Sequence, residues 1–102
     1  MSVNLKKQGQ FISILLDADL PLVQNVLSNA SAPQLSALAE IFYNIKNLPL
    51  SNEVYQKLTK YRPIFKRYVN NSSTRRRLAR KHFKIFKKTL DIIGYYILEL
   101  LK

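Results

Sequence analysis

The sequence has no cysteine, a single histidine, two glycines and six acidic residues among its 102 positions. Without cysteine the chain forms no disulfide bond and offers no thiolate to a metal, and His82 cannot complete a metal site or a catalytic triad alone. Two glycines are too few for a glycine-rich phosphate loop. Asp17 and Asp19 border a turn, where they fit helix caps better than an acid–base pair. We therefore expect a binding protein that is not an enzyme and needs no cofactor or metal.

Long apolar stretches are also missing. The stretch Phe11–Leu16 covers only six residues and is followed by two aspartates, so it does not fit the core of a secretory signal. No apolar run approaches the roughly 20 residues that a membrane-spanning helix needs. We expect a soluble chain that is not secreted, has no transmembrane segment, and works inside the cell or packaged in a particle.

Positive charge is what the sequence has in excess, with 17 lysines and arginines and a net charge of +11. Residues 1–53 hold three bases and four acids, a net charge of −1, whereas residues 54–102 hold 14 bases and two acids, a net charge of +12. Solubility alone needs only a few units of net charge. The asymmetry therefore indicates a polyanionic partner for the second half. The hydrophobic content of 47% suits one folded domain over residues 1–102.

Apolar residues at helical spacing and clear helix-start signals predict an all-α domain, a compact bundle of four or five helices. Asp19 and Ser51 are candidate N-caps, and Ser31 with Gln34 forms a capping box. Pro63 lies inside one helical pattern and should kink or split that helix. The expected helices cover residues 3–16, 19–27, 31–45, 51–68 and 74–101.

The last predicted helix is the most unusual part of the chain. Its first segment, Ser72–Lys88, reads SSTRRRLARKHFKIFKK, contains no acid, and has Ser72 or Ser73 available as the N-cap. Its last segment, Ile92–Leu101, is apolar nearly all round and needs burial on several sides. The pattern predicts one long C-terminal helix that is basic first and apolar afterwards.

The basic segment has the character of a phosphate-binding surface, because cations at helical spacing can replace the counterions of a nucleic-acid backbone. The start of a helix also attracts anions. No helix-turn-helix glycine turn, zinc finger or RNP-type aromatic motif is present, so we expect binding to be independent of base sequence. The expected partner is duplex DNA, with RNA left open. The residues expected to contact it are Arg75, Arg76, Arg77, Arg80, Lys81, Lys84, Lys87 and Lys88, with Arg62, Lys66 and Arg67 extending the surface.

Two groups of side chains leave alternatives open. Tyr55, Tyr61 and Tyr68 lie among lysines and arginines, and they fit either core positions, which their spacing favours, or stacking partners for nucleic-acid bases. His82 lies on the apolar stripe of the last helix. It fits a partly buried side chain better than a pH-dependent switch.

The apolar C-terminal segment has three interpretations. We favour burial against residues 11–16 and 35–45, and the alternatives are a homo-oligomer seam and an interfacial membrane segment beside the basic face. The alternative to nucleic-acid binding is accordingly a helical module that docks an acidic protein partner or self-associates. Attachment to a membrane surface is a third alternative, which the sequence favours less. The seam would involve Ile92, Tyr96, Ile97 and Leu101.

The middle of the chain carries a family resemblance. A block of the type E-x-x-x-N…LPLS…L-x-x-Y is formed by Ala32–Glu40, Asn44, Leu48–Ser51, Leu58 and Tyr61. A segment rich in lysine and arginine follows it. Over residues 13–88 the chain resembles small basic open reading frames of large DNA viruses and transposons of the Polinton and adintovirus kind. The resemblance implies a virion-associated protein, of the adenovirus-like core type, in the host nucleus or the virion. Many of those sequences end in a glycine-rich apolar tail, whereas this chain has only Gly94 there.

Overall fold

The computed structural model describes residues 3–101, apart from the side chain of Leu100, and these residues form helices joined by short connections without any strand. The all-α prediction is therefore confirmed. The predicted number of helices is wrong, because the described residues form eight α-helices and two 3-10 turns. They are α1 (Val3–Lys7), α2 (Gly9–Asp17), α3 (Leu20–Ser28), α4 (Ala32–Tyr43), η1 (Asn44–Asn47), α5 (Asn52–Thr59), α6 (Arg62–Asn70), η2 (Ser72–Thr74), α7 (Arg75–Lys81) and α8 (Phe83–Leu101).

Helix starts follow the local sequence closely. The Asp19 carboxylate accepts a hydrogen bond from the backbone N–H of Leu22 at 3.1 Å, and the Ser51 hydroxyl caps α5. Ser31 and Gln34 form the expected capping box, in which the Gln34 side chain accepts from the Ser31 N–H at 2.8 Å. These bonds satisfy donors that the first turn of a helix leaves unpaired. The predicted caps of α3, α4 and α5 are thus confirmed.

Helix interruptions follow the sequence less closely. The split at Pro63 is confirmed, since α5 ends at Thr59 and α6 begins at Arg62. The expected helix over residues 3–16 is instead divided at Gln8, just before the glycine that weakens it. The N-terminal half of the chain therefore consists of shorter helices than its periodicity indicates.

The largest correction concerns the expected long helix over residues 74–101, which is interrupted at His82 (φ −113°, ψ 28°). Neither proline nor glycine marks this position. The reason is packing, because α7 lies against α3 and α6, whereas α8 lies against α3 and α2. The break allows Ala79 of α7 and Phe86 of α8 both to be buried. The predicted cap by Ser72 or Ser73 is also wrong, since Thr74 precedes α7 without a side-chain cap and Asn71 caps η2 by accepting from the Ser73 N–H.

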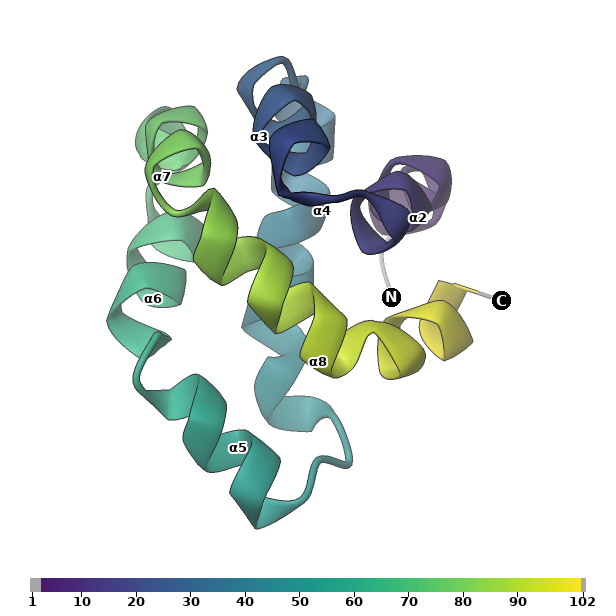
Figure 1. Ribbon diagram of the computed structural model, residues 1–102, viewed down its shortest axis with the longest axis vertical. Coiled ribbons are helices and arrows are strands. Elements are labelled where there is room, and N and C mark those ends of the chain that lie inside the picture. The colour runs from purple at the N-terminus through teal and green to yellow at the C-terminus, as the bar shows by residue number, and fades with distance from the viewer. Residues whose placement is uncertain (1–2, 102) are drawn as a thin grey trace.

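Four aromatic rings form the centre of the core, where α8 crosses in front of α4 (Figure 1). Phe42 of α4 stacks on Phe65 of α6, with ring centroids 4.6 Å apart, and meets Phe86 of α8 edge-on at 4.8 Å. Tyr68 of α6 meets Phe86 edge-on at 5.0 Å. These contacts join three helices that are distant in sequence, and edge-on pairs stabilise a core beyond the area that they bury.

The second part of α8 packs into the core. Ile93 and Ile97 are buried, and Gly94 lies so close to α2 that an added Cβ would approach Leu16 Cδ2 to 2.9 Å. The favoured interpretation, burial of the apolar C-terminal segment, is therefore confirmed for these positions. Ile97 is only 2% exposed, so it is not accessible to a second copy as the oligomer seam required. Ile92, Tyr96 and Leu101 are half-buried.

We expect Tyr68→Phe to lower the free energy of unfolding by about 1 kcal/mol. The buried Tyr68 hydroxyl donates a hydrogen bond to the Leu35 carbonyl oxygen at 2.7 Å, and phenylalanine removes that donor without changing the ring. Urea denaturation followed by circular dichroism measures the difference. Tyr95→Phe is the control, because Tyr95 is 72% exposed and its removal should leave the midpoint unchanged. Equal midpoints for both variants would contradict the expectation.

Candidate nucleic-acid interface

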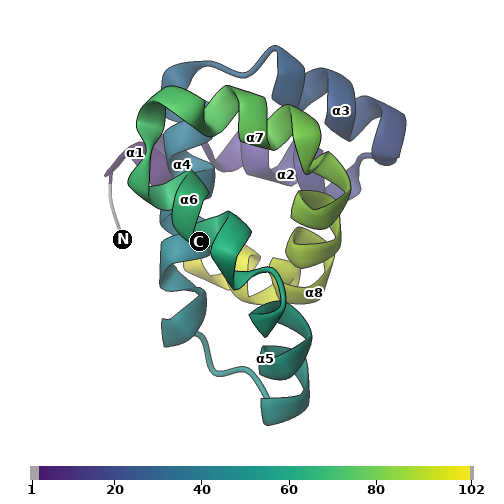
Figure 2. The ribbon, with the colours of Figure 1, turned by 90° about the vertical axis from the view of Figure 1, so that its left-hand side faces the viewer.

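The cations expected to bind nucleic acid come from α6, α7 and the start of α8, which are neighbours in space (Figure 2). In that view α7 runs above α6 and alongside α3. The eleven side chains do not form one uniform surface, however. Some of them bind backbone carbonyl groups of the protein itself, and the others point to solvent in two separate places.

Arg75, one of the residues predicted to contact nucleic acid, is half-buried and bonds to the end of α6. Its Nε donates to the Tyr68 carbonyl oxygen at 3.0 Å and its Nη2 to the Val69 carbonyl oxygen at 2.8 Å. Its guanidinium also lies 5.9 Å from the centroid of the Tyr68 ring. These carbonyls belong to the last turn of α6, where a helix has unpaired acceptors and partial negative charge. Arg75 therefore caps α6.

Lys87 has the same capping role at the end of α2. Its ammonium donates to the carbonyl oxygens of Leu15 and Leu16 at 3.0 and 2.7 Å. The same ammonium pairs with the Asp91 carboxylate at 2.9 Å, and the Lys87 side chain is only 12% exposed. A cation so enclosed is not available to a phosphate.

Arg76 and Arg80 each bond to the end of a helix and also face solvent. Each donates one hydrogen bond of 3.3 Å to the carbonyl oxygen of Ser28, the last residue of α3, yet both side chains remain exposed. A guanidinium has five N–H donors, so one weak bond leaves most of them available. The two arginines are thereby held in position while they face solvent.

The sequence contains one signal for these capping roles. Neither α2 nor α3 has a basic residue in its last turn, so neither supplies its own C-terminal cation. The excess of cations in α7 and α8 supplies them through space. Part of the positive charge thus stabilises the fold and is no indication of a partner.

The remaining cations of α7 are exposed in an open depression of about 580 Å³, lined by Ser73, Arg76, Arg77, Arg80 and Lys81. No carboxylate lines this depression. Arg77 and Lys81, and Lys84 beyond them, make no side-chain hydrogen bond or ion pair within residues 3–101. We call the exposed cations of this region, Arg76, Arg77, Arg80, Lys81 and Lys84, the α7 cation row.

Arg67 of α6 lies close to this row, as its effect on His82 indicates. Partial burial lowers the pKa of His82, and the positive charges of Lys81 and Arg67 lower it further. A pKa below the ordinary value of about 6.5 leaves His82 neutral at pH 7. The imidazole therefore adds no charge to the row.

Lys88 lies elsewhere, beside the turn between α5 and α6. Desolvation acts to raise the pKa of the Tyr61 hydroxyl, but the ammonium groups of Lys60 and Lys88 outweigh it, and the pKa lies below its ordinary value. Lys60 Nζ is 5.1 Å from the centroid of the Tyr61 ring. Arg62 and Lys66 face a separate groove on the α4 side of α6. These three predicted site residues are thus apart from the α7 cation row.

In the part of the chain that the structure describes, no three histidine, aspartate or glutamate side chains gather in a way that would hold a metal ion. Over residues 3–101, every helix also falls short of the length or the apolarity that crossing a membrane requires.

Comparison of the chain with protein-family models, with curated protein sequences and with solved structures finds no match in any of the three.

We expect Lys87→Met to lower the free energy of unfolding by about 1.5–3 kcal/mol, because two carbonyl groups of α2 and Asp91 lose a charged partner. Lys84→Met is the matched control, since this exposed lysine three positions earlier bonds to nothing in the described chain. Thermal denaturation of both variants measures the difference. A Lys87 variant as stable as the Lys84 variant would show that the cap contributes nothing.

Proposed function

We propose that the protein binds nucleic acid without sequence preference, through contacts between the α7 cation row and backbone phosphates. The observation that carries the proposal is the open depression on α7, which four exposed cations and no carboxylate line. Cations that face solvent together without acidic neighbours repel one another, and a polyanion relieves that repulsion. Arg67 adds an exposed cation on α6, the helix that packs against α7.

The arrangement of the row favours a linear polyanion. Arg76 and Arg80 lie one helical turn apart, as do Arg77 and Lys81, and the first two are held by the Ser28 carbonyl. Positions fixed in this way lose less conformational freedom on binding than those of a disordered basic tail. Arginine also binds phosphate through two parallel hydrogen bonds.

The salt dependence of the affinity follows from the number of available cations. Five residues in the row and Arg67 give six contacts at most, and counterion release on duplex DNA then gives a log–log salt slope of roughly −5. Arg75 and Lys87 are left out of this number because they bind carbonyl groups of the protein. No base-reading motif accompanies the row, which favours recognition of the phosphate backbone alone.

The biological setting that we propose is the one that the family resemblance implies. A small basic protein that coats or condenses DNA without sequence preference suits the core of a DNA virus or of a related mobile element. Duplex DNA in the host nucleus or the virion is accordingly the partner that we propose for the α7 cation row.

We expect the double variant Arg77→Gln, Lys81→Gln to weaken binding equally on unrelated duplexes and to reduce the salt slope by about 2. The matched control is Lys6→Gln, Lys7→Gln, which removes two exposed cations of α1 and should change the slope less. Fluorescence anisotropy with two unrelated duplexes across a salt series measures both quantities.

Two results would contradict the proposal. One is the absence of duplex binding at low salt. The other is binding that persists at several hundred millimolar salt, because counterion release requires a steep loss of affinity. Binding of a glutamate-rich peptide in place of DNA would favour an acidic protein partner instead.

A further inference from the structure

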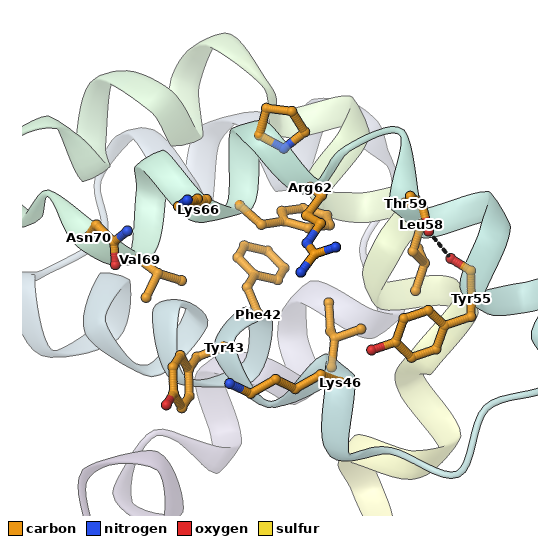
Figure 3. Close-up of a pocket in the computed structure, with 13 residues that line it drawn as sticks. Phe42, Tyr43, Lys46, Tyr55, Leu58, Thr59, Arg62, Lys66, Val69 and Asn70 are labelled. Atoms are coloured by element: carbon orange, nitrogen blue, oxygen red, sulfur yellow. Dashed lines mark hydrogen bonds between the residues drawn. The ribbon is translucent and has the colours of Figure 1, made fainter.

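A second concave feature lies on the other side of α6 from the α7 cation row. It is a groove of about 720 Å³ between α4 with η1 on one side and α5 with α6 on the other (Figure 3). This volume falls in the range of small-molecule sites. Among the side chains that line the groove are three cations and no carboxylate.

The three cations are Lys46 of η1 and Arg62 and Lys66 of α6, all exposed. The guanidinium of Arg62 points into the space between Phe42 and Tyr55 (Figure 3), and it has no hydrogen-bond partner within residues 3–101. The ammonium of Lys46 lies 4.3 Å from the centroid of the Tyr43 ring. The groove therefore presents positive charge to solvent with no internal anion to neutralise it.

Aromatic rings accompany these cations. Phe42 and Phe65 form an apolar floor of stacked rings, and both are buried. Tyr43 and Tyr55 lie on opposite sides of Lys46 and are 56% and 37% exposed (Figure 3). Exposed rings beside unpaired cations, over an apolar floor, match a ligand that has both a planar ring and a negative charge.

We propose that this groove binds an unpaired nucleotide of single-stranded nucleic acid, with its base against Tyr43 or Tyr55 and its phosphates near Lys46, Arg62 and Lys66. In a duplex the bases are stacked on one another, so their faces do not reach a protein ring. A single strand exposes them. This inference rests on the proposed nucleic-acid binding and adds to it a site that distinguishes a single strand from a duplex.

The groove also has one wall that is weakly attached. Among the residues of α5, only Leu58 is buried, and α5 projects from the rest of the molecule in both ribbon views (Figures 1 and 2). Elements with few buried contacts open at low cost. Tyr55 is on this helix, so the groove can widen around a base without disturbing the aromatic core.

The test uses the full chain and two fluorescein-labelled probes, an oligothymidylate of about 15 nucleotides and the duplex that it forms with oligoadenylate. We expect Tyr43→Leu, Tyr55→Leu to weaken single-strand binding by about 5- to 100-fold, the worth of one stacked base, and to change duplex binding less than about twofold. Tyr95→Leu is the control, because Tyr95 is 72% exposed and lies on α8, outside the groove.

A second variant tests the groove independently, in case the first variant does not fold. Arg62→Gln, Lys66→Gln changes two exposed side chains and should weaken single-strand binding several-fold, whereas Lys6→Gln, Lys7→Gln should not. Circular dichroism establishes that each variant is folded. A labelled glutamate-rich peptide, added to the same proteins, tests the alternative that an acidic peptide occupies the groove.

The outcomes separate this inference from the proposed function. If both groove variants are folded and bind the single strand and the duplex normally, the proposed nucleotide site in the groove is wrong and the proposed function stands. No binding of either nucleic acid at low salt overturns both proposals. Peptide binding that the Tyr43 and Tyr55 changes reduce, with no effect of those changes on oligothymidylate, overturns the nucleotide assignment in favour of an acidic peptide.

Discussion

The ring of Phe86 on α8 lies where this helix meets α4 and α6, which are distant from it in sequence. The packing of these three helices depends on that ring. It contacts Phe42 of α4 and Phe65 and Tyr68 of α6. Helices of 5–12 residues, such as α1 to α7, are unstable alone and form only when an apolar face is buried. A chain of 102 residues has a small core, so this one cluster of rings supplies much of the apolar surface that the short helices bury.

Short helices have a second requirement, because each one ends in unpaired carbonyl groups. Here the carbonyls at the ends of α2, α3 and α6 receive hydrogen bonds from Lys87, from Arg76 with Arg80, and from Arg75. All of these donors belong to α7 and α8, the last part of the chain. Part of the positive charge therefore stabilises the fold, and the charge available to a partner is smaller than the net charge of +11 indicates.

Two groups of the remaining cations lie in places with different shapes. The α7 cation row is an open surface without exposed aromatic rings in its lining, which suits a phosphate backbone. The groove beside α4 is concave and contains tyrosines, which suits a single base with its phosphates. Because α6 borders both, one protein would be able to hold a duplex and an unpaired strand at neighbouring sites.

The sequence by itself determined the all-α class, the caps of α3, α4 and α5 and the split at Pro63, because these depend on residues near one another in the chain. Only the tertiary structure decided the break at His82 and the inward roles of Arg75 and Lys87. Both depend on which helix ends lie beside α7 and α8, at separations of up to 72 residues. Helical periodicity shows that a side chain leaves the core face, but it does not show whether that side chain then meets water or the carbonyl end of another helix.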